Sequence, residues 1–147
     1  MRRYWLAWLV LSSFIIGVIA VIILSIWPYE TLYIKEPITV KTKVLTTESA
    51  VILNIDYCNY RLSDKLVFSI VDNATLRAYE LYSSSGTALK KGFVKGCKVR
   101  DIPVPLSLLA SNLPNGTYYY QFDLDFDVNP LKTIHKTFKT EVFELRR

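Results

Sequence analysis

The chain has 147 residues, a formal net charge of +5 and a hydrophobic content of 51%. This length suits one membrane segment followed by one domain, since domains typically contain about 50 to 200 residues. The positive charge is modest, and its basic residues are not interleaved with aromatic ones, which argues against nucleic acid as a partner.

The first predicted element is an apolar segment from Leu6 to Ile26, which runs for 21 residues without a charge. As a helix it would be about 31 Å long, close to the roughly 30 Å hydrocarbon core of a bilayer. Tryptophans are typical of membrane interfaces, and all three in the chain lie near the ends of this segment: Trp5, Trp8 and Trp27. The sequence therefore predicts a membrane-spanning helix.

The charges on either side of the segment predict its orientation. Arg2 and Arg3 precede it, whereas the first basic residue after it is Lys35. Because basic flanks stay in the cytoplasm, we expect residues 1–27 to form a cytoplasmic N-terminus and membrane helix, with residues 28–147 as an extracytoplasmic domain. A cleavable signal peptide is the alternative, but its apolar region would be shorter and would end in a small-residue cleavage site.

After the helix the composition changes to alternating β-branched, aromatic and polar residues, which is typical of half-buried strands. The segment from Leu106 to Ser111 is expected to form a short helical turn, and Pro103 and Pro105 indicate an edge or irregular strand. With about seven short strands and no amphipathic helix, we expect a mainly β fold, an antiparallel β-sandwich. The strands are predicted at 38–45, 50–57, 66–71, 76–82, 98–104, 118–128 and 133–145.

Two cysteines, Cys58 and Cys97, lie in the predicted outer domain. An even number of cysteines in an oxidising compartment favours a disulfide. The two residues lack the neighbouring histidine or second cysteine that a metal site would need. A disulfide between them would close a loop of about 40 residues.

A possible interaction surface combines basic residues with tyrosines that we expect to be exposed, because exposed tyrosines are enriched at protein interfaces. The basic cluster could equally be an ordinary solvated loop and strand edge, or could contact anionic lipid headgroups, glycans or an acidic partner. The residues of this surface are Tyr60, Tyr82, Lys90, Lys91, Lys95, Lys98, Arg100 and Tyr119.

Asp123, Asp125 and Asp127 alternate along one predicted strand, and alternating carboxylates can bind Ca²⁺. However, Val128 stands where an EF-hand loop needs glycine, which favours a solvated strand face balanced by His135, Lys139 or Lys132 on the next strand. His135 is the only histidine, and no nucleophile or paired carboxylate is linked to it by spacing. We therefore expect neither a cofactor nor catalysis.

The stretch Leu113-x-x-Gly116-x-Tyr118 resembles the tyrosine corner of immunoglobulin-like sandwiches, in which the tyrosine hydroxyl bonds to the backbone a few residues upstream. This resemblance implies an immunoglobulin-like topology. Tyr120 stands where an antibody domain has its second cysteine, and the outer domain lacks tryptophan. The resemblance is therefore to the broad architecture and not to antibody domains.

A second resemblance is to small membrane proteins encoded by tailed bacteriophages and other bacterial viruses. It is carried by Tyr57-Cys58-Asn59-Tyr60, the spacing of the cysteines, and the segments 128–131 and 138–143. The expected function is that of a single-pass membrane protein whose outer domain is a protein-interaction or structural module, with the bilayer and other membrane or envelope proteins as partners. The alternative is a membrane-anchored domain that binds glycan or Ca²⁺.

Overall fold

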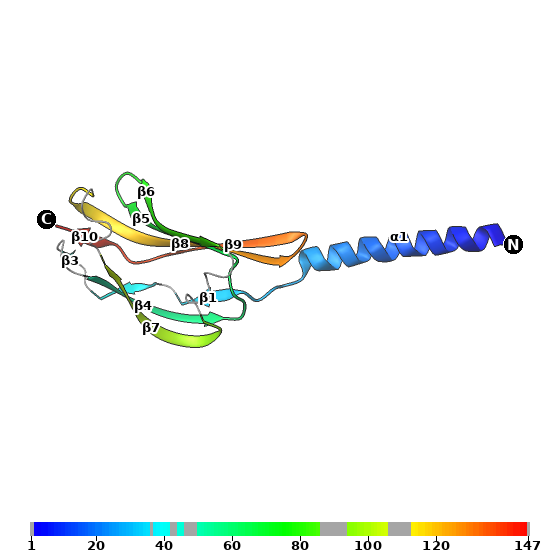
Figure 1. The fold of residues 1–147 in the computed structure, drawn as a ribbon, viewed down its shortest axis with the longest axis horizontal. Coiled ribbons are helices and arrows are strands. Elements are labelled where there is room, and N and C mark those ends of the chain that lie inside the picture. Colours follow the sequence, from blue (N-terminus) through cyan, green and yellow to red (C-terminus); the bar gives the residue numbers. More distant parts are fainter. Residues whose placement is uncertain are drawn as a thin grey trace. The chain divides into compact units, whose positions relative to one another are not determined.

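The computed structural model describes residues 2–35, 37–41, 44–45, 50–85, 94–105 and 113–146. The chain forms two compact units: Met1–Tyr29 with Asp127–Thr133, and Glu30–Phe126 with Ile134–Arg147. The described residues contain one helix and ten strand segments (Figure 1). The expected helical turn at 106–111 lies outside the described residues.

Helix α1 spans Arg2–Ile26 in the first unit and confirms the predicted apolar helix. The Trp27 amide still donates to the carbonyl of Ile23 at 3.0 Å, and the helix stops there. Pro28 accounts for the stop, because proline lacks an amide proton and disfavours helical geometry in the residue before it.

One sheet of the second unit is built around β4, to which three other segments pair antiparallel. β1 and β2 lie along one side of β4, and β7 pairs with its whole length on the other side. The segments are β1 (Leu32–Ile34), β2 (Thr39–Val40), β4 (Ala50–Asn59) and β7 (Gly96–Pro105).

The other sheet has the order β3-β10-β8-β5-β6, and β9 also pairs with β8. Its neighbours are antiparallel except β3 and β10, which are parallel. The segments are β3 (Val44–Leu45), β5 (Lys65–Asp72), β6 (Ala78–Ser85), β8 (Gly116–Asn129), β9 (Lys132–Lys139) and β10 (Phe143–Leu145).

The structure has more segments than the seven predicted strands because two of those strands are interrupted. The predicted strand 38–45 is divided into β2 and β3, which belong to different sheets, and 133–145 is divided into β9 and β10. The short β1 is additional. The mainly β, antiparallel fold with one N-terminal helix is confirmed.

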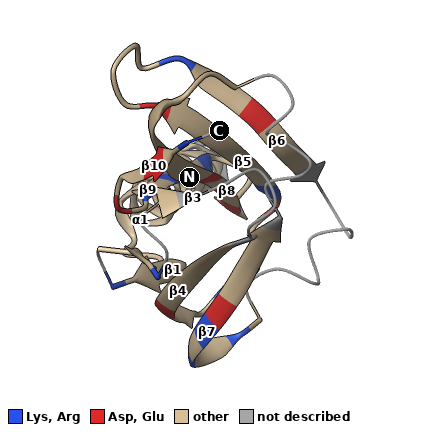
Figure 2. Ribbon diagram, turned by 90° about the vertical axis from the view of Figure 1, so that its left-hand side faces the viewer, with Lys and Arg blue, Asp and Glu red and all other residues tan. Residues whose placement is uncertain are grey.

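Residues that alternate along the strands form the core between the two sheets, which appear as separate layers in Figure 2. On β4 every second side chain from Val51 to Tyr57 is buried, and on β8 the same holds from Tyr118 to Val128. The ring of Phe68 stacks on Tyr120 and Phe122, with centroids 5.0 and 4.7 Å away. Aromatic rings therefore fill the centre of the core.

Tyr118 stands at the start of β8, where the sequence resembles a tyrosine corner. Its hydroxyl donates to the Pro114 carbonyl at 2.7 Å, four residues upstream. Leu113, the first residue of the pattern, is also buried. The corner fixes how the chain enters β8, and β8 pairs with β5, β9 and β10.

Candidate membrane segment and interaction surface

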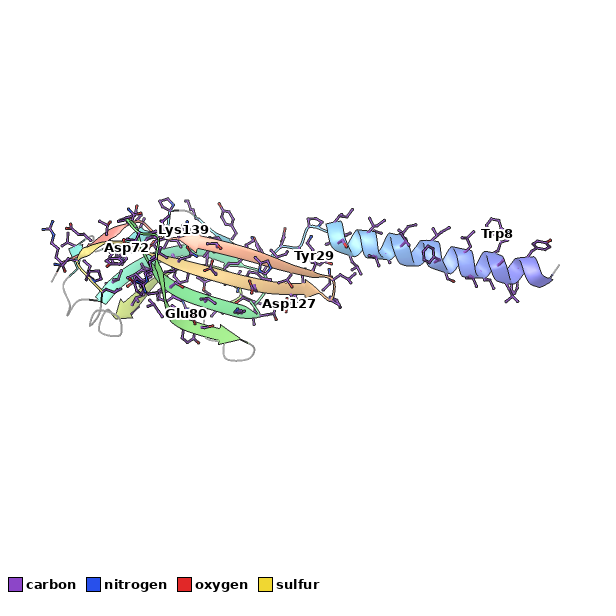
Figure 3. All side chains as sticks on the ribbon, turned by 90° about the horizontal axis from the view of Figure 1, so that it is seen from above. Trp8, Tyr29, Asp72, Glu80, Asp127 and Lys139 are labelled. Carbon is purple, nitrogen blue, oxygen red and sulfur yellow. A yellow bond between two sulfur atoms is a disulfide. The ribbon has the colours of Figure 1, made fainter. Side chains whose placement is uncertain are left out.

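Within the described residues, one helix is long and apolar enough to span a membrane: Tyr4–Ile26, with 23 residues and none of the tested window buried. Its side chains project outward on all sides, as Trp8 does in Figure 3. The Ser13 hydroxyl donates to the Leu9 carbonyl at 2.8 Å, and Ser25 bonds to Val21 in the same way. The three serine hydroxyls of the helix, including that of Ser12, are thus satisfied within it, as an apolar solvent requires.

The C-terminal end of α1 is hydrogen-bonded to the turn between β8 and β9, within the first unit. The Asn129 side-chain amide donates to the Leu24 carbonyl at 3.0 Å and to the Tyr29 hydroxyl at 2.9 Å. Lys132 donates to the Ser25 carbonyl at 2.8 Å and lies over the Tyr29 ring. These bonds satisfy carbonyls that a helix end leaves without partners, and they place a cation at the negative end of the helix dipole.

The predicted disulfide joins Cys58 and Cys97, which lie directly opposite each other on β4 and β7. Cys58 points to the outer face of its sheet, because the neighbouring Tyr57 and Asn59 point into the core. Cys97 is exposed. The disulfide therefore links two neighbouring strands of one sheet on its outer surface and does not cross the core.

The described part of the basic cluster lies on and beside β7. Lys95, Lys98 and Arg100 are exposed, whereas Lys90 and Lys91 lie outside the described residues. On β7, Lys98 and Arg100 stand opposite Tyr57 and Ile55 of β4, which are buried. The two basic residues therefore occupy positions on the core-facing side of the sheet. Within the described residues β7 pairs only with β4, and charges at core-facing positions are typical of such edge strands.

The three candidate tyrosines do not form one surface. Tyr60 follows β4 and is 54% exposed, whereas Tyr82 lies on β6, in the other sheet, and is 50% exposed. The prediction of an exposed Tyr119 is wrong, because this side chain is 8% exposed. Tyr119 pairs with Val71 in the middle of its sheet, and the Lys139 ammonium lies 5.4 Å from its ring centre. Lys139 is labelled in Figure 3.

The three aspartates of β8 each bond to a different side chain on β9. Thr137 donates to Asp123, His135 Nδ1 lies 2.6 Å from Asp125 Oδ1, and Thr133 donates to Asp127. Of the three suggested balancing residues, His135 makes this contact, while Lys132 and Lys139 contact other groups. The described residues hold no cluster of three or more metal-binding side chains.

A polar group on the outer face of the β4 sheet was not predicted from the sequence. Asp101 on β7 pairs with Lys41 and accepts a hydrogen bond from Asn54 on β4 at 2.7 Å. The bonds from Lys41 and Asn54 hold the pKa of the Asp101 carboxyl below its ordinary value. These partners are 60 and 47 residues distant in sequence, so no local pattern could have revealed the group.

The candidate features are an exposed apolar helix with a capped end in the first unit and, separately, a disulfide-bonded edge strand in the second. No protein-family model matches the sequence, and no curated protein matches it.

Proposed function

We propose that this protein is a single-pass membrane protein whose N-terminus is cytoplasmic and whose β-sandwich lies outside the cytoplasm. The sandwich is an immunoglobulin-like protein-interaction or structural module within a membrane or virion assembly, without catalytic activity. The observation that carries the proposal is the fully exposed apolar helix. A helix that is hydrophobic on all sides needs either a protein core or a lipid bilayer around it.

The order of the strands supports the immunoglobulin-like assignment. The first strand region contributes β2 to one sheet and β3 to the other, where β3 runs parallel to the last strand, β10. The Tyr118 hydroxyl bond is a further characteristic of these sandwiches. The disulfide differs from that of antibody domains, since it joins β4 to β7 within one sheet.

Two sheet edges support a role in protein contact. Within the described residues, β6 pairs only with β5 and β7 only with β4. A strand with one neighbour can pair with a strand of another chain through its free backbone groups. β7 carries two prolines and exposed charges, which discourage such pairing, whereas β6 carries the exposed aromatic Tyr82. β6 is therefore the better candidate for contact with a protein partner.

The test is extraction of the native membrane or particle in mild detergent, followed by identification of the proteins that co-migrate with the full chain. We expect a stoichiometric set of membrane proteins, and a reduced set for Tyr82→Ser. Val142→Ser is the matched control, because Val142 is also exposed but precedes β10, on the other side of β8 from β6. A chain that migrates alone would contradict the assembly role.

The orientation needs a separate measurement on intact cells. An impermeant amine reagent applied from outside should modify Lys139, which is exposed on β9. Modification only after the membrane is opened would place the domain in the cytoplasm and contradict the proposed topology.

A further inference from the structure

The Cys58–Cys97 disulfide lies at the edge of its sheet. Within the described residues β7, which carries Cys97, pairs only with β4, so no strand lies along its other side (Figure 1). β4 carries Cys58 and has strands on both sides, with Tyr33 of β1 directly opposite Cys58. The two sulfur atoms therefore differ in their surroundings, because one belongs to an edge strand and the other to a central strand.

Solvent reaches Cys97 more easily than Cys58. Cys97 is exposed, whereas Cys58 is half-buried. Gly96, which precedes Cys97, has no side chain to cover it, and a Cβ atom placed at Gly96 would meet none of the described atoms beyond its chain neighbours within 4 Å. Because exchange with a thiol needs access to one of the two sulfur atoms, an exposed disulfide is the kind that exchanges readily.

The pairing of the two strands keeps the cysteines opposite each other without the covalent bond. β4 and β7 pair antiparallel from Ala50 opposite Pro105 to Asn59 opposite Gly96. Reduction removes a link on the outer surface of the sheet, and the pairs along the rest of β7 hold its register. The buried residues of β4, such as Leu53 and Ile55, lie on the other face. We therefore expect the two thiols to remain close enough to form the bond again.

We propose that Cys58–Cys97 is a reversible thiol–disulfide exchange site, which a dithiol partner reduces by attack at Cys97. A thiolate of the partner attacks the Cys97 Sγ atom, the Cys58–Cys97 bond breaks, and Cys58 leaves as a thiolate that takes up a proton. The second thiolate of the partner then attacks the partner's first sulfur and releases Cys97, which is also protonated. The chain gains two electrons and two protons, and the dithiol loses both and becomes a disulfide.

The first experiment measures how fast reduced dithiothreitol reduces the full chain in mild detergent, with and without urea at one pH. If reduction required global unfolding, the folded chain would react at least about a thousandfold more slowly than the unfolded chain, because folded domains are stable by about 5 kcal/mol or more. We expect the two rates to agree within about tenfold, since Cys97 is already accessible. A thousandfold difference would overturn the proposal.

The same samples test reversibility. The circular dichroism of the β-sheets should persist after reduction, and oxidised dithiothreitol should restore the disulfide. Loss of the sheet signal on reduction would show that the bond is purely structural and would overturn a reversible site.

Cys58→Ser and Cys97→Ser form a matched pair that tests which sulfur is attacked. Each variant leaves one thiol, whose reaction with glutathione disulfide is measured in the folded and in the urea-unfolded chain. Folding should slow the reaction of Cys58 about tenfold more than that of Cys97, because Cys58 is half-buried beside Tyr33. Equal slowing of both thiols would overturn the assignment of the attack to Cys97. None of these outcomes depends on the membrane anchor or on the proposed assembly.

Discussion

Two neighbouring tyrosines on β8 offer a test of the tyrosine corner in which one residue is the control for the other. Tyr118 and Tyr120 are both fully buried on the same face of the strand. The Tyr118 hydroxyl donates to the Pro114 carbonyl, but the Tyr120 hydroxyl has no hydrogen-bond partner among the described residues. Burial also raises the pKa of Tyr120 far above its ordinary value, because the phenolate would lose its solvent.

Replacing each tyrosine by phenylalanine removes one oxygen atom and leaves the ring in place. Tyr118→Phe loses a hydrogen bond of 2.7 Å, which contributes about 0.5 to 1.5 kcal/mol net. Because Pro114 is exposed, its carbonyl can bind water instead, so we expect a loss of about 1 kcal/mol in the free energy of unfolding. Tyr120→Phe removes a buried hydroxyl without a partner, and should be neutral or stabilise the fold by up to about 1 kcal/mol.

The measurement is urea unfolding of the full chain in mild detergent with the disulfide intact. The circular dichroism of the β-sheets is the signal that monitors unfolding. Tryptophan fluorescence is unsuitable, since all three tryptophans lie in or beside the helix. The free energies of unfolding of the two variants should differ by about 1 to 2 kcal/mol, with Tyr118→Phe the less stable. A Tyr118→Phe protein as stable as Tyr120→Phe would refute the view that the hydroxyl bond stabilises the corner.

Three further predictions concern the disulfide, the Asp101 carboxyl and the end of the helix. Replacing both disulfide cysteines by alanine should lower the free energy of unfolding by about 4 kcal/mol in urea titrations, because a loop of about 40 residues is released in the unfolded chain. The pKa of Asp101 is lower in the folded chain than in the unfolded one, so its carboxylate stabilises the fold above about pH 4, and this contribution disappears as the pH falls and the carboxyl is protonated in the folded state. In acid titrations, the free energy of unfolding of Asp101→Asn should therefore fall less steeply below about pH 4 than that of the unaltered protein. The lowered pKa is attributed first to the bond from Lys41. This attribution would be contradicted if Asp101→Asn kept the steep acid transition, or if replacing a carboxylate far from Lys41 removed the transition equally. A double-mutant cycle of Asn129→Ala and Tyr29→Phe, measured by unfolding, should give a coupling of about 0.5 to 1 kcal/mol from their hydrogen bond, and additive effects would contradict it.

The elements predicted correctly are those whose signal is local. The helix from Leu6 to Ile26 follows from its length and uniform apolarity, and β8 follows from six apolar residues at two-residue spacing. The tyrosine corner and the edge position of β7 also depend on short patterns: Leu113-x-x-Gly116-x-Tyr118 in one case, and two prolines in the other.

The predictions that failed or were missed depend on contacts distant in sequence. Tyr119 has the parity of an exposed residue, but it is buried beside Val71 of β5, with the Lys139 ammonium 5.4 Å from its ring centre. The predicted strand 38–45 changes sheet because Thr39 pairs with Asn54 and Val44 pairs with Glu144. Local alternation assigns a residue to one face of a strand, but it does not say which sheet the strand joins or what covers that face.

The aromatic core and the disulfide lie in different parts of the β domain. The ring of Tyr120 lies 5.1 Å from Phe143 and 5.0 Å from Phe68. Aromatic rings in contact with one another therefore occupy the centre of the core. The disulfide fixes the beginning of β7, a strand whose core-facing positions include the charged residues Lys98 and Arg100. Loss of the disulfide should accordingly loosen β7 first and leave the sheet that contains β8 intact. Amide hydrogen exchange should then become faster along β7 than along β8.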